Sequence, residues 1–110
     1  AFLSEFGITT SGLSAMDIRD VRKVEQVTSR EVLETGLRAF ETNPDADAIL
    51  ISCGALHTLE ITEALERETG KTVISSAVAG AWGAAAIAGI DTRRSGYGHW
   101  LETGGGSDAA

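Results

Sequence analysis

The chain has 110 residues, 43% of them hydrophobic, which is enough for the core of one small domain. A formal charge of −7 and a pI near 4.7 leave no basic surface for nucleic acid or anionic membranes, so both kinds of partner are excluded. No apolar run approaches the roughly 18 residues of a membrane span, and the single cysteine, Cys53, permits no internal disulfide, so we expect a cytoplasmic protein.

The first quarter of the chain carries weak structural signals. Residues 2–6 place apolar side chains on one helical face, and Gly7 is positioned to end that helix. Residues 7–13 predict a short extended piece, whereas residues 13–27 show no single period and predict a loop with some helix. Because the chain starts at Ala1 inside a helical pattern, we expect the N-terminal part of a larger protein to precede it.

A clearer helix is predicted over residues 28–41. Thr28 and Glu31 have the T-x-x-E spacing of a capping box, in which each side chain bonds the other residue's backbone N–H. The helix carries an apolar stripe made by Val32, Leu33, Leu37 and Phe40. Residues 43–47, N-P-D-A-D, predict a turn because proline cannot continue a helix.

The second half of the chain alternates strands with helices. A continuous apolar run over residues 48–52 predicts a strand buried on both faces. Residues 55–69 follow with helical spacing, up to a stop at Gly70. Residues 71–75 predict a second strand, and residues 77–89 predict an alanine-rich helix.

The alanine-rich helix carries no charge, so we expect it to be buried on more than one side. Gly80 and Gly83 within it indicate close packing against a neighbour, at some cost in helix propensity. Residues 1–103 then form one lobe, and the glycine-rich residues 104–110 form a flexible tail.

The alternation predicts an α/β fold with a parallel sheet and right-handed crossovers. We expect a Rossmann-like, three-layer lobe of about three strands and three to four helices. In such sheets, ligands bind at the carboxyl ends of the strands. Cys53 follows the first strand, and Ser75 and Ser76 follow the second, so the pattern brings these three residues to one crevice.

Cys53 has two readings, as a buried small hydrophobe or as a reactive thiolate. A thiol ionises more easily at a helix N-terminus, and the expected helix starts near Ala55. Gly54 has no side chain, so a ligand can approach its backbone N–H closely. The strand–loop–helix junction therefore favours a functional cysteine with N–H donors for a carboxylate or an enolate oxygen.

Four polar residues near Cys53 have both functional and structural readings. His57 is expected in the first helical turn, as a surface residue or as a proton carrier. Thr58 either donates its hydroxyl to a ligand or bonds the local backbone. Ser75 and Ser76 either hold a carboxylate or, for one of them, only cap the last helix.

Other kinds of site are not supported. The two histidines and one cysteine show no H-x-x-x-H or C-x-x-C spacing, so no metal site is predicted. No G-x-G-x-x-G follows a strand, so nucleotide binding is not supported. Trp82 and Trp100 are interpreted as packing residues.

Several motifs resemble one known family. They are S-C-G-A-L-H-T at 52–58, A-L-E-R-E-T-G-K-T-V-I-S-S at 64–76, A-x-x-W at 79–82 and G-Y-G at 96–98. Together they are similar to the C-terminal lobe of the aspartate/glutamate racemase superfamily, in the branch of arylmalonate decarboxylase and maleate cis–trans isomerase. The resemblance runs from F-L-S-E-F-G-I near the start to G-Y-G.

The resemblance implies a cofactor-free enzyme of two similar α/β lobes, with the active site between them and one lobe present here. It places Cys53 on the cysteine that protonates a carbanion or adds to a double bond, and Gly54 on a backbone donor for a substrate carboxylate. Leu13 and Met16 are similar to residues of an apolar pocket. Ala55 stands beside the substrate where decarboxylases tend to have a second glycine, so decarboxylase and isomerase both stay open.

Three hypotheses follow. The first is a decarboxylase or cis–trans isomerase of small dicarboxylic acids, the second is a racemase that uses Cys53 with a cysteine in the other lobe, and the third is a catalytically silent α/β fragment. The expected partner is a small carboxylic-acid substrate. We expect a homo-oligomer, because an absent first strand would leave sheet edges unpaired, and we expect the chain alone to lack efficient turnover.

Overall fold

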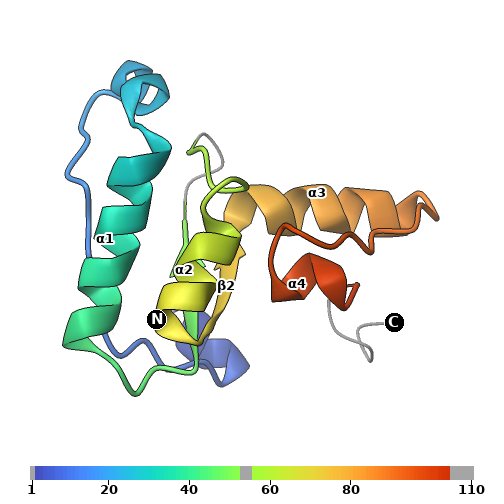
Figure 1. Ribbon diagram of the computed structural model, residues 1–110, viewed down its shortest axis with the longest axis horizontal. Helices are drawn as coiled ribbons and strands as arrows, with labels where there is room; N and C mark the ends of the chain where they lie inside the picture. Colours follow the sequence, from blue (N-terminus) through green and yellow to red (C-terminus); the bar gives the residue numbers. More distant parts are fainter. Residues whose placement is uncertain (1, 53–55, 105–110) are drawn as a thin grey trace.

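The computed structural model describes residues 2–52 and 56–104, and residues 1, 53–55 and 105–110 lie outside the described part. In Figure 1, α1 and α2 lie side by side and α3 extends away from them. The elements in chain order are η1 (Leu3–Phe6), η2 (Val21–Gln26), α1 (Ser29–Thr42), β1 (Ala48–Ile51), α2 (Thr62–Thr69), β2 (Thr72–Ser75), α3 (Ser76–Ile87) and α4 (His99–Glu102).

The N-terminal segment has little regular structure. The predicted first helix is confirmed as the 3-10 helix η1, which ends at Gly7 with φ +76°, a left-handed conformation that glycine adopts without strain. Residues 7–13 pair with neither strand, and Gly12 lies against the side chain of Asn43 at the end of α1. The 3-10 helix η2 supplies the short helix that was expected within the following loop.

The helix α1 begins as its sequence predicts. The Thr28 hydroxyl accepts a hydrogen bond from the backbone N–H of Glu31 at 3.2 Å, and the Glu31 carboxylate accepts one from the backbone N–H of Thr28 at 2.8 Å. This confirms the capping box, which satisfies two of the N–H groups that a helix start leaves open. The helix ends before Pro44, in the predicted turn.

The two strands pair in parallel, with Ala48 opposite Thr72 and Ile51 opposite Ser75. The chain passes from β1 to β2 through α2, so the predicted α/β class with a parallel sheet is confirmed. The described sheet has two strands where about three were expected, because the extended residues 7–13 remain outside it.

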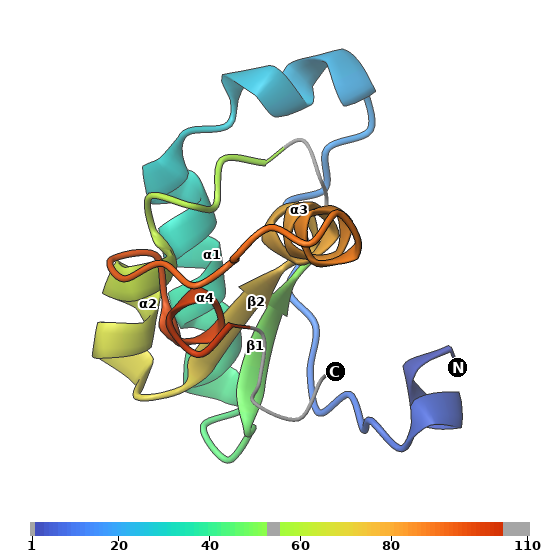
Figure 2. The same ribbon diagram turned by 90° about the vertical axis from the view of Figure 1, so that its right-hand side faces the viewer.

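The core lies between α1, α2 and one face of the sheet (Figure 2). At its centre, Leu65 of α2 is 0% exposed. A Cβ added at Gly36 of α1 would lie 2.7 Å from the Leu65 side chain, so the glycine allows the two helices to approach closely. The buried cluster consists of Val32, Ile61, Leu65 and Val73.

The other face of the sheet is open in the described residues. Leu50 is 55% exposed, whereas Ile49 and Ile51 pack against the core. The prediction of a strand buried on both faces was therefore wrong for β1. The helices α1 and α2 cover the opposite face of the sheet, where the core lies.

The helix after β1 starts later than predicted. The helix α2 begins at Thr62 and not near residue 55, and the described residues before it form a bend and a turn closed by the Ile61 N–H on the Thr58 carbonyl at 3.2 Å. Leu56 and Ile61 nevertheless reach the core. Their helical spacing misled the prediction because a loop can bury the same side chains. The stop at Gly70 is confirmed, with φ +70°.

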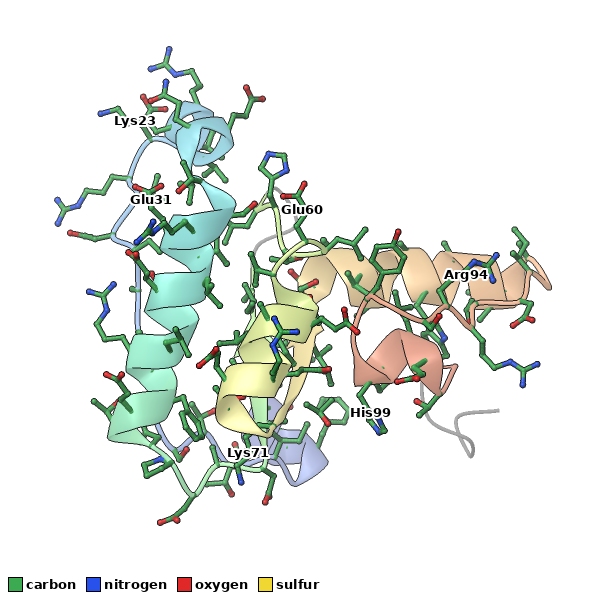
Figure 3. The ribbon with its side chains drawn as sticks, viewed as in Figure 1. Lys23, Glu31, Glu60, Lys71, Arg94 and His99 are labelled. Atoms are coloured by element: carbon green, nitrogen blue, oxygen red, sulfur yellow. The ribbon has the colours of Figure 1, made fainter. Side chains whose placement is uncertain are left out.

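The C-terminal segment is held against the free edge of β2 by Glu66 of α2. Its carboxylate accepts hydrogen bonds from the backbone N–H of Val73 at 3.0 Å and from that of His99 at 2.9 Å. Gly98, at φ +101°, lies so close to Thr62 that a Cβ would come within 2.5 Å of its methyl group. One carboxylate thus fixes both the strand edge and the start of α4, where Figure 3 shows His99.

The helix α3 departs from its expected burial. It has no buried residue, Ile87 is 91% exposed, and a Cβ at Gly80 or Gly83 would meet open space. The predictions of burial on more than one side and of close packing at the glycines were therefore wrong for the described structure. The physical reason is visible in Figure 1, where α3 leaves the end of β2 and points away from the body.

The tryptophans pack as the sequence suggested. Trp82 of α3 meets Trp100 of α4 nearly edge-on, with ring centroids 5.5 Å apart. Their indole N–H groups find no hydrogen-bond acceptor among the described residues. This ring contact joins α3 to α4.

Candidate functional site

The carboxyl edge of the sheet gathers the residues that the sequence singled out. Ile51, the last residue of β1, is opposite Ser75, the last residue of β2, so both strands end at the same level. The chain enters α3 directly at Ser76. A helix N-terminus and two strand ends therefore meet at one edge, which is where parallel α/β sheets bind ligands.

The three residues expected to carry most of the chemistry, Cys53, Gly54 and Ala55, lie outside the described residues. Their position in the chain is still informative. Cys53 follows Ile51 by two residues, and the described chain resumes at Leu56, which packs against the core. The neighbours on both sides of the predicted cysteine loop thus belong to the carboxyl edge of β1 and to the core beside it.

Ser75 caps α3. Its hydroxyl accepts a hydrogen bond from the backbone N–H of Val78 at 3.2 Å, and its side chain is buried, with 2% exposure. This confirms that one of the two serines is a helix cap. Ser76, the first residue of α3, is exposed at the same edge.

Thr58 is joined to Ser75. Its hydroxyl donates to the Ser75 hydroxyl at 2.8 Å, and Thr58 is likewise only 2% exposed. Its carbonyl accepts hydrogen bonds from the Thr62 hydroxyl at 2.7 Å and from the backbone N–H of Ile61 at 3.2 Å. The loop after β1 is therefore bonded to the end of β2 and to the start of α2 through one residue.

The same loop has a second, exposed attachment. The Ser29 hydroxyl of α1 donates to the carboxylate of Glu60 at 3.0 Å. Figure 3 shows Glu60 on the loop above α2. His57 is exposed in this loop and not in a first helical turn, so the expected placement of His57 was wrong because α2 starts only at Thr62.

Leu13 and Met16 do not join this group. Leu13 is 88% exposed and follows Gly12, which contacts Asn43 at the C-terminal end of α1. The chain enters β1 from that end, so Leu13 lies toward the amino edge of the sheet. Met16 packs against the core cluster. The structure thus joins Thr58 to Ser75 and its neighbour Ser76, and it places Met16 near Val27 and Glu31.

A groove of about 530 Å³ begins beside Thr58 and runs along α3, a size in the range of small-molecule pockets. Its walls are mostly apolar, with charged groups from the segment after α3, where Figure 3 shows Arg94. The Asp91 carboxylate accepts hydrogen bonds from the Arg93 backbone N–H and from the Arg93 guanidinium. These two bonds, the backbone one foremost, hold the pKa of the Asp91 carboxyl below its ordinary value. Sequence reasoning missed this groove, and its only signal was the D-T-R-R run after the last long helix.

Two other features are absent from the described part of the chain, a cluster of metal ligands and a membrane-spanning helix. Within residues 2–52 and 56–104, no three His, Cys, Asp or Glu side chains gather as metal ligands would. No described helix combines the length and the apolar character that are needed to cross a membrane.

Comparison with known proteins shows which family the chain resembles. The family model of arylmalonate decarboxylase matches residues 1–101. Arylmalonate decarboxylase of Bordetella bronchiseptica is 39% identical over 103 residues, which are 93% of this chain and 43% of that protein. The chain therefore spans less than half the length of this relative.

Solved structures agree with the sequence match. A crystal structure of arylmalonate decarboxylase superposes with a TM-score of 0.82 at 38% identity, covering 91% of this chain and 44% of that one. A mutant of the same enzyme in a sulfate-associated form gives a TM-score of 0.83 and covers 91% of this chain and 43% of that one. The described lobe thus has the fold of part of that enzyme, and the chain belongs to the arylmalonate decarboxylase family.

Proposed function

We propose that the chain is the cysteine-bearing lobe of a cofactor-independent decarboxylase that acts on small dicarboxylic acids such as arylmalonates. One observation carries this proposal. The family match runs through residues 1–101 and includes the S-C-G motif, which directly follows the end of β1, the strand end that lies level with the start of α3. Strand ends and a helix N-terminus at one edge suit a carboxylate substrate.

The proposed reaction uses Cys53 as a proton donor. The bond between the α-carbon and one carboxylate breaks, CO₂ leaves, and the electron pair stays on the α-carbon and the remaining carboxylate as an enediolate. The Cys53 thiol then transfers its proton to the α-carbon, and the resulting thiolate regains a proton from water. Backbone N–H groups stabilise the negative charge that develops on the substrate oxygens.

The electrostatic support for Cys53 has to come from a different helix than the sequence indicated. The helix α2 begins nine residues after Cys53, at Thr62, so its N-terminus is not the next turn of the chain. The helix α3 begins at the same sheet edge as the end of β1, and its twelve residues give a helix dipole whose positive end faces that edge. We therefore assign the helix effect on the thiol to α3.

The remaining predicted site residues have different roles in this proposal. Gly54 and Ala55 flank the cysteine and are proposed to present backbone donors to a carboxylate. Ser76 is an exposed residue at the edge and is proposed to face the substrate, while Thr58 and Ser75 border the site from the buried side. The apolar pocket wall expected of Leu13 and Met16 stays a prediction.

The cis–trans isomerase and racemase alternatives differ from the decarboxylase in the form of Cys53 that reacts. Protonation of a carbanion requires the thiol, so the decarboxylation rate falls as pH rises through the pKa of Cys53. Addition to a double bond, or removal of a proton by Cys53, requires the thiolate, so those rates rise over the same range. The direction of the pH dependence therefore separates the decarboxylase from the other two, and turnover of maleate or of aspartate distinguishes the isomerase from the racemase.

The chain alone is proposed to be an incomplete catalyst. In the proposed mechanism, oxyanion donors outside these residues complete the site, and each missing donor costs roughly 10² to 10³ in rate. Assays of the purified chain with arylmalonate, maleate and aspartate should give no Cys53-dependent turnover in the ordinary range of about 1 to 10³ s⁻¹. Turnover in that range would show that these residues suffice and would overturn the assignment of donors elsewhere.

Self-association and location complete the proposal. The outer edge of β2 is closed by Glu66, whereas β1 has no second strand beside it in the described residues, so the β1 edge is where a second copy would pair. We propose a homo-oligomer formed there, and a monomer by sedimentation would contradict it. The single cysteine fits a reducing cytoplasm, and the proposed chemistry uses no cofactor.

A further inference from the structure

We propose that Thr58 is a positioning residue, which holds the loop after β1 against the N-terminus of α3 and does not touch substrate. This inference rests on the proposed function of Cys53, because its consequence is read at that thiol. The observation behind it is the buried hydrogen bond between the hydroxyls of Thr58 and Ser75, at 2.8 Å.

The hydroxyl and the carbonyl of Thr58 are already used within the protein. The hydroxyl proton goes to Ser75, and the carbonyl accepts from the Thr62 hydroxyl and from the backbone N–H of Ile61. With 2% of its surface exposed, Thr58 offers almost no area for a ligand to contact. A threonine in this state fixes geometry instead of binding substrate.

The hydrogen bond from Thr58 connects the loop to α3, because its partner Ser75 caps that helix. Ser75 is at once the last residue of β2 and the cap of α3, because its hydroxyl also accepts the Val78 N–H at 3.2 Å. The Ser75 hydroxyl therefore receives one hydrogen bond from the loop and one from the helix. Through it, Thr58 sets how the loop that begins at β1 sits relative to the helix end that we assign to Cys53.

The loop has a second attachment that makes a matched control. Ser29 donates to Glu60, two residues after Thr58, but this bond lies at the surface, where water can replace either partner. If the placement of the loop depends on the buried bond, loss of the exposed bond should leave the chemistry of Cys53 unchanged.

The experiment uses the 110-residue chain, in which Cys53 is the only cysteine, so alkylation by iodoacetamide reports on one thiol. The rate is measured against pH for the parent and for Thr58→Val, Thr58→Ser, Ser75→Ala and Ser29→Ala, with circular dichroism to confirm that each variant is folded. The pH profile gives two quantities, the midpoint of ionisation and the limiting rate of the thiolate.

We expect Thr58→Val to move the midpoint toward the ordinary value of about 8.5 and to change the limiting rate by about two- to tenfold, the factor that one hydrogen bond carries. Ser75→Ala removes the same bond together with the cap of α3, so it should change the profile at least as much, and Thr58→Val should add little to it because the bond between the two hydroxyls is already lost. Thr58→Ser keeps the hydroxyl and should restore the parent profile. Ser29→Ala should match the parent.

The outcomes separate this inference from the proposed function. A parent midpoint at or above about 8.5 would count against an activated Cys53, yet a changed limiting rate in Thr58→Val would still support positioning. A depressed parent midpoint with parent-like profiles in Thr58→Val and Ser75→Ala would overturn the positioning role and leave the function standing. If Thr58→Val does not fold, Thr58→Ala replaces it, because it removes the same hydroxyl and leaves the Ser75 cap of α3 in place.

Discussion

Replacing Glu66 tests how the C-terminal segment is held to the sheet. The Glu66 carboxylate accepts from the backbone N–H of Val73 at 3.0 Å and from that of His99 at 2.9 Å. Val73 is 1% exposed, so Glu66→Ala leaves a buried N–H without an acceptor, whereas the exposed His99 N–H turns to water. A hydrogen bond to a charged group contributes about 1.5–3 kcal/mol, so we expect a loss of about 2–3 kcal/mol.

This loss corresponds to a fall in Tm of about 8–12 °C, at about 4 °C per kcal/mol for a chain of this size. Glu66→Gln keeps one acceptor oxygen but turns an NH₂ group toward the second donor, so its loss should be intermediate. Glu68→Ala, an exposed carboxylate on the same helix, is the control and should stay within about 0.5 kcal/mol of the parent. Urea unfolding followed by circular dichroism gives each free energy of unfolding, and equal values for Glu66→Ala and Glu68→Ala would refute the reasoning.

Three further predictions concern the packing of the lobe. Leu65→Ala should cost about 2–5 kcal/mol of unfolding free energy, because Leu65 is fully buried, and a loss as small as that of Leu59→Ala at the half-exposed surface would contradict this core. Gly98→Ala should cost about 1–3 kcal/mol of unfolding free energy, from its positive φ and the contact with Thr62. Gly96→Ala should cost less, because its added Cβ meets open space, and equal losses would show that the contact with Thr62 does not contribute. Gly80→Ala and Gly83→Ala should each stabilise the chain by about 0.5–1 kcal/mol through helix propensity, and a lower Tm in either variant would show that α3 is closely packed in solution.

The parts of the fold that local chemistry determines could be predicted from the sequence. Thr28 and Glu31 set the start of α1, because a capping box involves only neighbouring residues. Gly7 and Gly70 end their helices in the left-handed conformation for the same local reason. The alternation of strands and helices was enough to predict the parallel sheet.

The parts that depend on what covers an element could not be predicted. An apolar run over residues 48–52 indicates a buried strand, but Leu50 is exposed because no described element lies over that face. The apolar spacing after β1 could not distinguish a helix from a loop that buries Leu56 and Ile61. The bond between Thr58 and Ser75 joins residues seventeen positions apart, so no local pattern could reveal it.

The most direct test of the central claim is decarboxylation by a chimera in which residues 1–103 replace the matching part of the Bordetella bronchiseptica enzyme. The account predicts release of CO₂ from an arylmalonate, with a rate that falls as pH rises through the pKa of Cys53. Cys53→Ser should reduce that rate by about 10² to 10⁴, the usual contribution of a positioned acid. A folded chimera that releases no CO₂, or one whose rate is unchanged in Cys53→Ser, would contradict the claim that Cys53 is the proton donor of a decarboxylase.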